Sequence, residues 1–198
     1  MEDKPKRFGS YDFGEKGKRI YGTNIIVKNA EELSDGLEYV MENSRPMILK
    51  KRKAYYFKNA ILPKVILDGF TNLYVADSVV GELVMRRANV VDMYDCMIDR
   101  VRTEDDGYVK NLWIDESEIY DELAISKTEA RQLAVLNSYM ENVRIKGSRF
   151  THMHFRNMSL FDLRFNKTIV ENKVTMYDTY PKYVNIDNSC EVTIDMKS

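Results

Sequence analysis

The sequence contains few of the residues that build metal, redox or disulfide chemistry. Its 198 residues include only two cysteines, Cys96 and Cys190, and two histidines, His152 and His154. Two cysteines so far apart are too few for a disulfide framework or a zinc knuckle, so we expect a reducing compartment. The histidines have no third metal ligand beside them. We therefore expect them to be surface histidines, with no bound metal.

Long apolar runs are also missing. No run is long enough for a transmembrane helix, and the chain opens with the charged segment MEDKPKRFGSYDFGEKGKR. We expect no membrane contact and no secretion, and a location in the cytoplasm, or in the virion if the chain is viral. The glycines of residues 9–22 do not have the spacing of a phosphate-binding loop. We expect no cofactor.

The chain has enough apolar residues for one well-packed domain. Apolar residues make up 44% of the sequence and charged residues 31%, which is ordinary for a globular protein. Proline is confined to the ends, because none occurs between Pro63 and Pro181. That uninterrupted stretch carries the main pattern of the sequence.

The pattern is a pair of apolar or small residues, two positions apart, that recurs every five residues. Ten consecutive pairs run from Leu123/Ile125 to Thr168/Val170 and include Val143/Ile145, Ser148/Phe150 and Met153/Phe155. None of these twenty positions is charged, although the composition would place about six charges there by chance. A helix would need steps of three and four, and an ordinary strand steps of two.

A mean step of 2.5 residues requires a chain that turns a corner every five residues. Four such sides close a square coil of about 20 residues, and successive coils stack about 4.8 Å apart, the spacing of strands in a sheet. Residues i and i+20 then become neighbours, so Arg149 should lie over Glu129, and Arg144 next to Arg164.

Similar pairs occur earlier, from Ala60/Leu62 to Ser117/Ile119, with a slip after Ala88 and a break over residues 99–111. Over residues 60–172 the sequence resembles the pentapeptide-repeat family, which has a small first inward residue and Leu or Phe as the second. Met153, Met158 and Leu163 depart from that preference. The resemblance implies an all-β fold, a right-handed quadrilateral β-helix.

The two ends differ from this repeat. Residues 1–22 predict an extended arm, and residues 23–59 a strand-helix-strand cap. Asn29 and Glu32 form a capping-box pair before the apolar stripe of a helix over residues 30–43, placed to cap the first coil. Residues 173–198 predict a C-terminal strand pair, either a hairpin or a closing pair, or a cap.

The charges are unevenly spread and do not indicate catalysis. Residues 102–124 hold eight acids against two bases, and residues 143–167 six bases against one acid. The acids fall at outward or loop positions, and a filled core leaves no cavity for a small-molecule substrate. Ser138, Ser148 and Cys96 fall at inward positions, which favours packing over nucleophilic roles. We expect no enzymatic activity.

The preferred hypothesis is a non-enzymatic structural or protein-interaction scaffold, with a virus or phage particle component as one form of it. The partner is expected to be another protein chain, of the same or a different kind, that orders the arm. The expected contact residues are Arg7, Phe8, Tyr11, Phe13, Lys16, Lys18, Arg19, Trp113, Arg144 and Arg164.

Two alternatives remain open at this point. Some pentapeptide-repeat proteins resemble duplex DNA and bind type II topoisomerases; the acidic TEDDG segment resembles the loops that project from some of them, although the later coils here are basic. Direct nucleic-acid binding is disfavoured by a net charge of −1.

Overall fold

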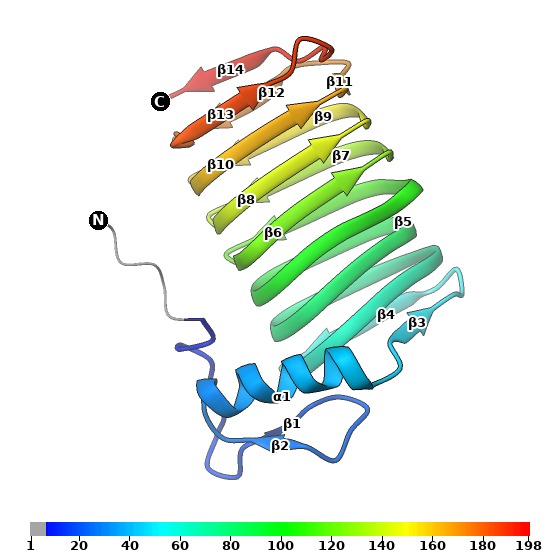
Figure 1. Cartoon of the computed structure of the whole chain (residues 1–198), viewed down its shortest axis with the longest axis vertical. Helices are drawn as coiled ribbons and strands as arrows, with labels where there is room; N and C mark the ends of the chain where they lie inside the picture. The colour runs from blue at the N-terminus through cyan, green and yellow to red at the C-terminus, as the bar shows by residue number, and fades with distance from the viewer. Residues whose placement is uncertain (1–6) are drawn as a thin grey trace.

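The protein is a parallel β-solenoid of about eight turns, with 64% of its residues in strands and 7% in helix. The computed structural model describes residues 7–198, apart from the side chain of Asp105. The coils stack into a rod whose N-terminal and C-terminal coils lie at opposite ends (Figure 1). The predicted all-β solenoid is confirmed.

The strands that build the solenoid follow one another along the chain and are separated by short turns. A two-residue pair, β1 (Lys18–Arg19) and β2 (Ile26–Val27), and helix α1 (Ala30–Asn43) precede the coils. The coil strands are β3 (Met47–Leu49), β4 (Ala54–Lys58), β5 (Ile61–Asp115), β6 (Glu118–Ser126), β7 (Glu129–Leu136), β8 (Tyr139–Lys146), β9 (Arg149–Arg156), β10 (Ser159–Asn166), β11 (Ile169–Val170), β12 (Val174–Tyr177), β13 (Tyr183–Ile186) and β14 (Ile194–Lys197).

Every pairing between coil strands is parallel, in the order β13-β10-β8-β6-β5-β7-β9-β12-β14. In the later coils Arg149 pairs with Glu129 and Arg164 with Arg144, as predicted. In the first coils the step between neighbouring coils is shorter, as in the pairing of Ala54 with Asn72. The step is already longer where Met97 pairs with Glu118, and a further register shift follows between Ile98 and Arg100.

The inward positions predicted from the five-residue pattern form the core. Of the twenty positions between Leu123 and Val170, all but the partly buried Ala130 are buried. The predicted break over residues 99–111 is wrong, because β5 continues through it with Val101, Thr103 and Val109 buried. The TEDDG segment therefore stays in the wall and does not project as a loop.

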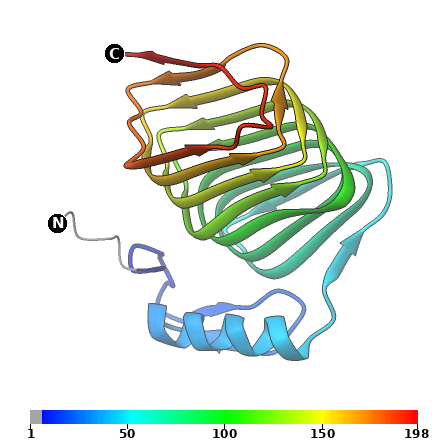
Figure 2. The ribbon, with the colours of Figure 1, turned by 45° about the horizontal axis from the view of Figure 1, so that its top comes forward.

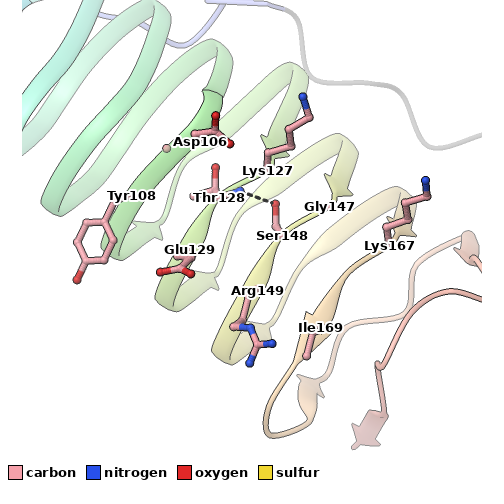
Figure 3. Close-up of a pocket in the computed structure, with 11 residues that line it drawn as sticks. Asp106, Tyr108, Lys127, Thr128, Glu129, Gly147, Ser148, Arg149, Lys167 and Ile169 are labelled. Atoms are coloured by element: carbon pink, nitrogen blue, oxygen red, sulfur yellow. Dashed lines mark hydrogen bonds between the residues drawn. The ribbon is translucent and has the colours of Figure 1, made fainter.

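Hydroxyl residues recur at two corners of the coils for a hydrogen-bonding reason, as at Ser117, Thr128, Ser138 and Ser148. The preceding residue has a positive φ, as at Lys127 (44°) and Gly147 (60°). The hydroxyl that follows donates to the carbonyl two residues earlier and accepts an N–H from the neighbouring coil. Thr128 N donates to Ser148 Oγ at 3.1 Å (Figure 3). Each hydroxyl thereby satisfies buried backbone groups at a corner.

Helix α1 begins and ends as predicted, but it does not cap the core of the first coil. Asn29 accepts the N–H of Glu32 at 2.9 Å, as an N-cap should. Leu33, Leu37 and Val40 form a separate apolar cluster with residues of β5, including Val79, outside the solenoid core. The helix therefore covers the outside of the first coils.

The arm differs from its prediction because it packs on its own chain. Phe8 is fully buried in the cluster of α1, edge-on to Tyr120 with ring centroids 5.7 Å apart. Arg7 Nη2 lies 2.5 Å from Asp99 Oδ1. From residue 7 onward the arm thus packs against the rest of the chain. Residues 1–6 of the predicted arm lie outside the described residues.

Of the predicted C-terminal strand pair or cap, the strand pair is not present in residues 173–198. The two strands pair with the coil beneath them, β13 with β10 and β14 with β12, and not with each other. They form a further coil, drawn in red in Figure 2.

Among the described residues, no helix is long and apolar enough to span a membrane.

Candidate interaction surface

The hollow drawn in Figure 3 lies along one corner of the later coils. Its charged residues are Asp106, Lys127, Glu129, Arg149 and Lys167. The lysines point to one side of the corner, and Glu129 and Arg149 to the other (Figure 3). Side chains that diverge in this way, with charges of both signs, do not build a site for one ligand.

Most residues of the predicted arm contact already have partners within the chain. Tyr11 packs edge-on to Phe13, and Lys18 lies 4.8 Å above the Tyr11 ring and donates to Asn59. Burial raises the pKa of Tyr11 to about 12, with Asp12 adding to the effect. Phe8, being fully buried, cannot contact a partner in this conformation. Lys16 and Arg19 remain exposed.

The other three predicted contact residues lie on the coils, Arg144 and Arg164 on β8 and β10 and Trp113 on β5. Arg144 and Arg164 stack in register, but each has an acid of its own: Arg144 lies 3.3 Å from Glu122, and Arg164 2.6 Å from Asp162. The predicted row of like charges is therefore neutralised. Trp113 lies on the wall of β5 and β7 with 38% of its surface exposed. The structure does not bring the ten predicted residues together.

Around Trp113 the structure gathers a different set of residues, which we call the acid–aromatic face. Its aromatic members stack at the coil spacing: the rings of Tyr56 and Tyr74 are parallel within 8° and 4.8 Å apart. Tyr56 is 73% exposed. The face comprises Tyr56, Tyr74, Asp77, Asp92, Tyr94, Asp95, Trp113, Asp115 and Glu116, which come from β4, β5 and the corner that follows β5.

The acids of this face lie close enough to oppose one another's ionisation. Asp77, Asp95 and Glu116 occupy equivalent positive-φ corner positions in successive coils. Burial raises the pKa of Asp95, and Asp77 and Glu116 raise it further. Burial likewise raises the pKa of Asp92, with help from Asp115. Like charges held on adjacent strands are unfavourable, and a cation between them would relieve the repulsion.

Bases are scarce on this face. Lys58 lies 3.3 Å from Asp77. Among the described residues, no base lies within ion-pair distance of Asp95, and Glu116 accepts a hydrogen bond from Tyr94 at 2.8 Å. The face therefore carries uncompensated negative charge beside exposed aromatic rings.

In the coils nearer the C-terminus, the residues at the same corner are amides, and they hydrogen-bond to one another. Asn157 Nδ2 donates to Asn137 Oδ1 at 2.9 Å, and Asn137 donates to Asp115 at 2.9 Å. An amide can donate and accept, so a column of amides is self-sufficient, whereas carboxylates only accept. Asp77 and Glu116 each have one partner, Lys58 and Tyr94, but the column of amides does not continue through the three acids.

The residues considered for chemistry in the sequence lie in the core or on the outer wall. Cys96 is buried, and burial raises the pKa of its thiol to about 12, so it stays protonated at neutral pH. His152 and His154 lie on the outer wall, flanking the inward Met153. Among the described residues, no group of three metal-ligating side chains is found.

Most of the acid–aromatic face was not predicted from the sequence, because the 20-residue step of the later coils was assumed for every coil. Tyr56 pairs in register with Tyr74, at the shorter step of the first coils, and Asp77 and Asp95 are separated by the same interval. That interval recurs in the first coils, so it was the signal that could have found them.

Comparison with protein-family models, curated proteins and solved structures finds no match.

Proposed function

We propose that this chain is a non-enzymatic protein-interaction scaffold of the pentapeptide-repeat kind, whose acid–aromatic face binds a Lys- or Arg-rich segment of another protein. The observation that carries the proposal is Asp95, which lies between Asp77 and Glu116 with no base of the described chain within ion-pair distance. A guanidinium or ammonium group placed there would be shared by stacked carboxylates.

The aromatic rings support the same partner chemistry. Tyr56, Tyr94 and Trp113 are exposed on a wall whose backbone is fixed by strand pairing. Cations bind over the faces of such rings, with a gain of about 0.5–1 kcal/mol at exposed sites. A rigid wall loses little conformational entropy on binding, which favours a scaffold role. The packed core, in turn, gives a small substrate no enclosed place to react.

Trp113 is the only tryptophan, so its fluorescence reports on this face directly. We expect a peptide of alternating Arg and Gly to change the emission of Trp113 in a saturable manner, and a Glu-Gly peptide of equal length to have no effect. Removing two charges with Asp95→Asn and Glu116→Gln should weaken binding about tenfold, since partly exposed pairs contribute up to about 1 kcal/mol each.

The matched control is Asp35→Asn with Glu42→Gln, which removes the same charge from exposed positions on α1. It should bind the peptide like the parent protein. Equal binding of both peptides, or equal losses in the two double variants, would overturn the proposal.

A second candidate is mimicry of duplex DNA toward a type II topoisomerase, which the same column of acids favours. Residues 60–126 carry fourteen acidic and six basic side chains, but residues 127–198 carry eight acidic and eleven basic. The acidic strip therefore ends about halfway along the rod. A gyrase supercoiling assay separates the two candidates, because only mimicry predicts inhibition. Recovery of coat or tail proteins from the native source would instead support the virus-particle form of the scaffold.

A further inference from the structure

The turn that joins β3 to β4 carries four consecutive bases at the side of the first coils (Figure 1). They are Lys50, Lys51, Arg52 and Lys53, and all four side chains are exposed. Among the described residues, no acid lies within ion-pair distance of any of them. The turn therefore concentrates positive charge that the described chain does not neutralise.

The backbone of this turn is held against the coils. β3 pairs with β5 before the turn, and β4 pairs with β5 after it. At the end of the turn, the N–H of Asn72 donates to the carbonyl of Lys53 at 3.1 Å. At its start, the Lys50 carbonyl lies so close to Gly69 that a Cβ there would collide with it. A glycine permits this close approach, so the four bases project from a fixed backbone.

A hollow beside the turn is lined by aromatic rings, amides and two of the bases of this side. The lining residues are Arg52, Phe70, Asn72, Asn89, Tyr108 and Lys110. The Arg52 guanidinium lies 5.1 Å from the centre of the Phe70 ring, and the Phe70 and Tyr108 rings are 5.5 Å apart. Tyr108 is 36% exposed. We call the turn and this hollow together the basic–aromatic surface.

The positive charge continues along the wall into the next coil. β5 pairs with β7 in register here, which places Lys110 beside Arg131. Within residues 7–198, neither base has a described acid within ion-pair distance. Glu129, the register partner of Tyr108, carries a negative charge at the edge of the surface. The surface thus combines several unpaired bases with aromatic rings, and it is separate from the acid–aromatic face.

We propose that the basic–aromatic surface binds single-stranded nucleic acid without sequence preference. Lysine and arginine side chains along a groove contact phosphates, and aromatic rings stack on unpaired nucleobases. An acidic peptide would use the charge but would leave the rings of Phe70 and Tyr108 without a stacking partner. The net charge of −1 does not oppose this proposal, because phosphates respond to charges within a Debye length, about 10 Å at 0.1 M salt.

Fluorescence anisotropy of a labelled oligo-dT of about 15 nucleotides, titrated with the whole chain, tests the proposal. We expect saturable binding that weakens with salt. The slope of log K against log salt should lie near −2 to −3, as for three or four phosphates at about −0.7 each. A duplex of the same length, whose nucleobases are paired, should bind more weakly. A Glu peptide of equal charge should bind at least tenfold more weakly.

Two variants separate the roles of charge and stacking. Lys51→Gln with Arg52→Gln should weaken oligo-dT binding about tenfold and make the salt slope shallower by about 1.4. Tyr108→Ala should weaken binding at least fivefold and leave the salt slope unchanged, because stacking releases no counterions. All three side chains are exposed, so we expect the far-ultraviolet circular dichroism to stay the same.

The matched controls remove the same groups from exposed positions elsewhere: Lys146→Gln with Lys167→Gln, and Tyr39→Ala on α1. They should bind oligo-dT like the parent protein. Absence of saturable binding, equal binding of the duplex or of the Glu peptide, or equal losses in the control variants would each overturn the proposal. None of these outcomes bears on Arg-Gly peptide binding at the acid–aromatic face, so the two proposals fail separately.

Discussion

The backbone N–H of Ser117 donates to the hydroxyl of Ser138 in the next coil at 3.0 Å. Ser138 in turn donates to the carbonyl of Leu136, so one side chain satisfies two buried backbone groups at a corner. This relationship recurs at the equivalent corners of other coils, between Ala60 and Ser78 and between Cys96 and Ser117. It explains why hydroxyl residues recur at these corners.

Ser138→Ala should therefore lower the free energy of unfolding by more than the loss of one oxygen atom suggests. The Ser117 amide would be left buried without an acceptor, at a cost of about 1–3 kcal/mol in the free energy of unfolding. Ser159→Ala is the control, because the Ser159 side chain is exposed; its effect should stay under about 0.5 kcal/mol. Urea denaturation of the two variants gives the comparison. Equal midpoints would show that water replaces the hydroxyl.

The fold could be predicted where one physical constraint acts at every repeat. Burial at each inward position, including Phe150 and Phe155, sets the register of the later coils regardless of what the outer wall carries. Asn29 and Glu32 likewise mark the start of α1 through local hydrogen bonds. Both signals are contained within a few residues of sequence.

The remaining parts depend on contacts that the sequence pattern does not encode. The number of residues in a coil depends on its corners and bulges, and the first coils contain fewer residues than the later ones. The coil length decides which residues stack on one another along the outer wall. The arm has a low apolar content overall, but the burial of one residue, Phe8, decides where it lies. Asp77, Asp95 and Glu116 form a column only after both coil lengths are known.

Phe155 and His154 provide a direct test of the register, because neighbours in sequence have opposite environments. Phe155 is fully buried, whereas His154 lies on the outer wall. Phe155→Ala should cost about 3–5 kcal/mol in the free energy of unfolding, through lost contacts and a cavity. His154→Ala should cost under about 0.5 kcal/mol. Thermal melts that show equal losses would mean that the register is wrong.

Phe8 tests whether the arm belongs to the fold. Its ring fills a site between α1 and Tyr120. We expect Phe8→Ala to lower the free energy of unfolding by about 3 kcal/mol or more, as for other buried Phe-to-Ala changes. Lys16→Ala, on the exposed part of the same arm, should change it by less than about 0.5 kcal/mol. If the two variants melt at the same temperature, the arm does not pack as described.

Glu82 should make the stability of the first coils depend on pH. Its carboxylate lies 2.6 Å from both Lys64 and Arg102, and its side chain is only 7% exposed. Burial acts to raise the pKa of Glu82, but the hydrogen bonds from Lys64 and Arg102 outweigh it and lower the pKa. A carboxyl whose pKa is lower in the folded state stabilises the fold above its unfolded pKa. That contribution is lost as the pH falls through the folded-state pKa.

We therefore expect the parent protein to lose stability between pH 5 and its acid transition by more than Glu82→Gln does. At pH 7 Glu82→Gln should be less stable by about 1–3 kcal/mol, because Lys64 and Arg102 lose their charged partner at a buried side chain. As the pH falls, the two unfolding curves should converge. Urea unfolding at pH 7, 5 and 3.5 measures the difference. If the difference in stability between the two proteins stays constant over this range, Glu82 stabilises the fold through its packing and not through its charge.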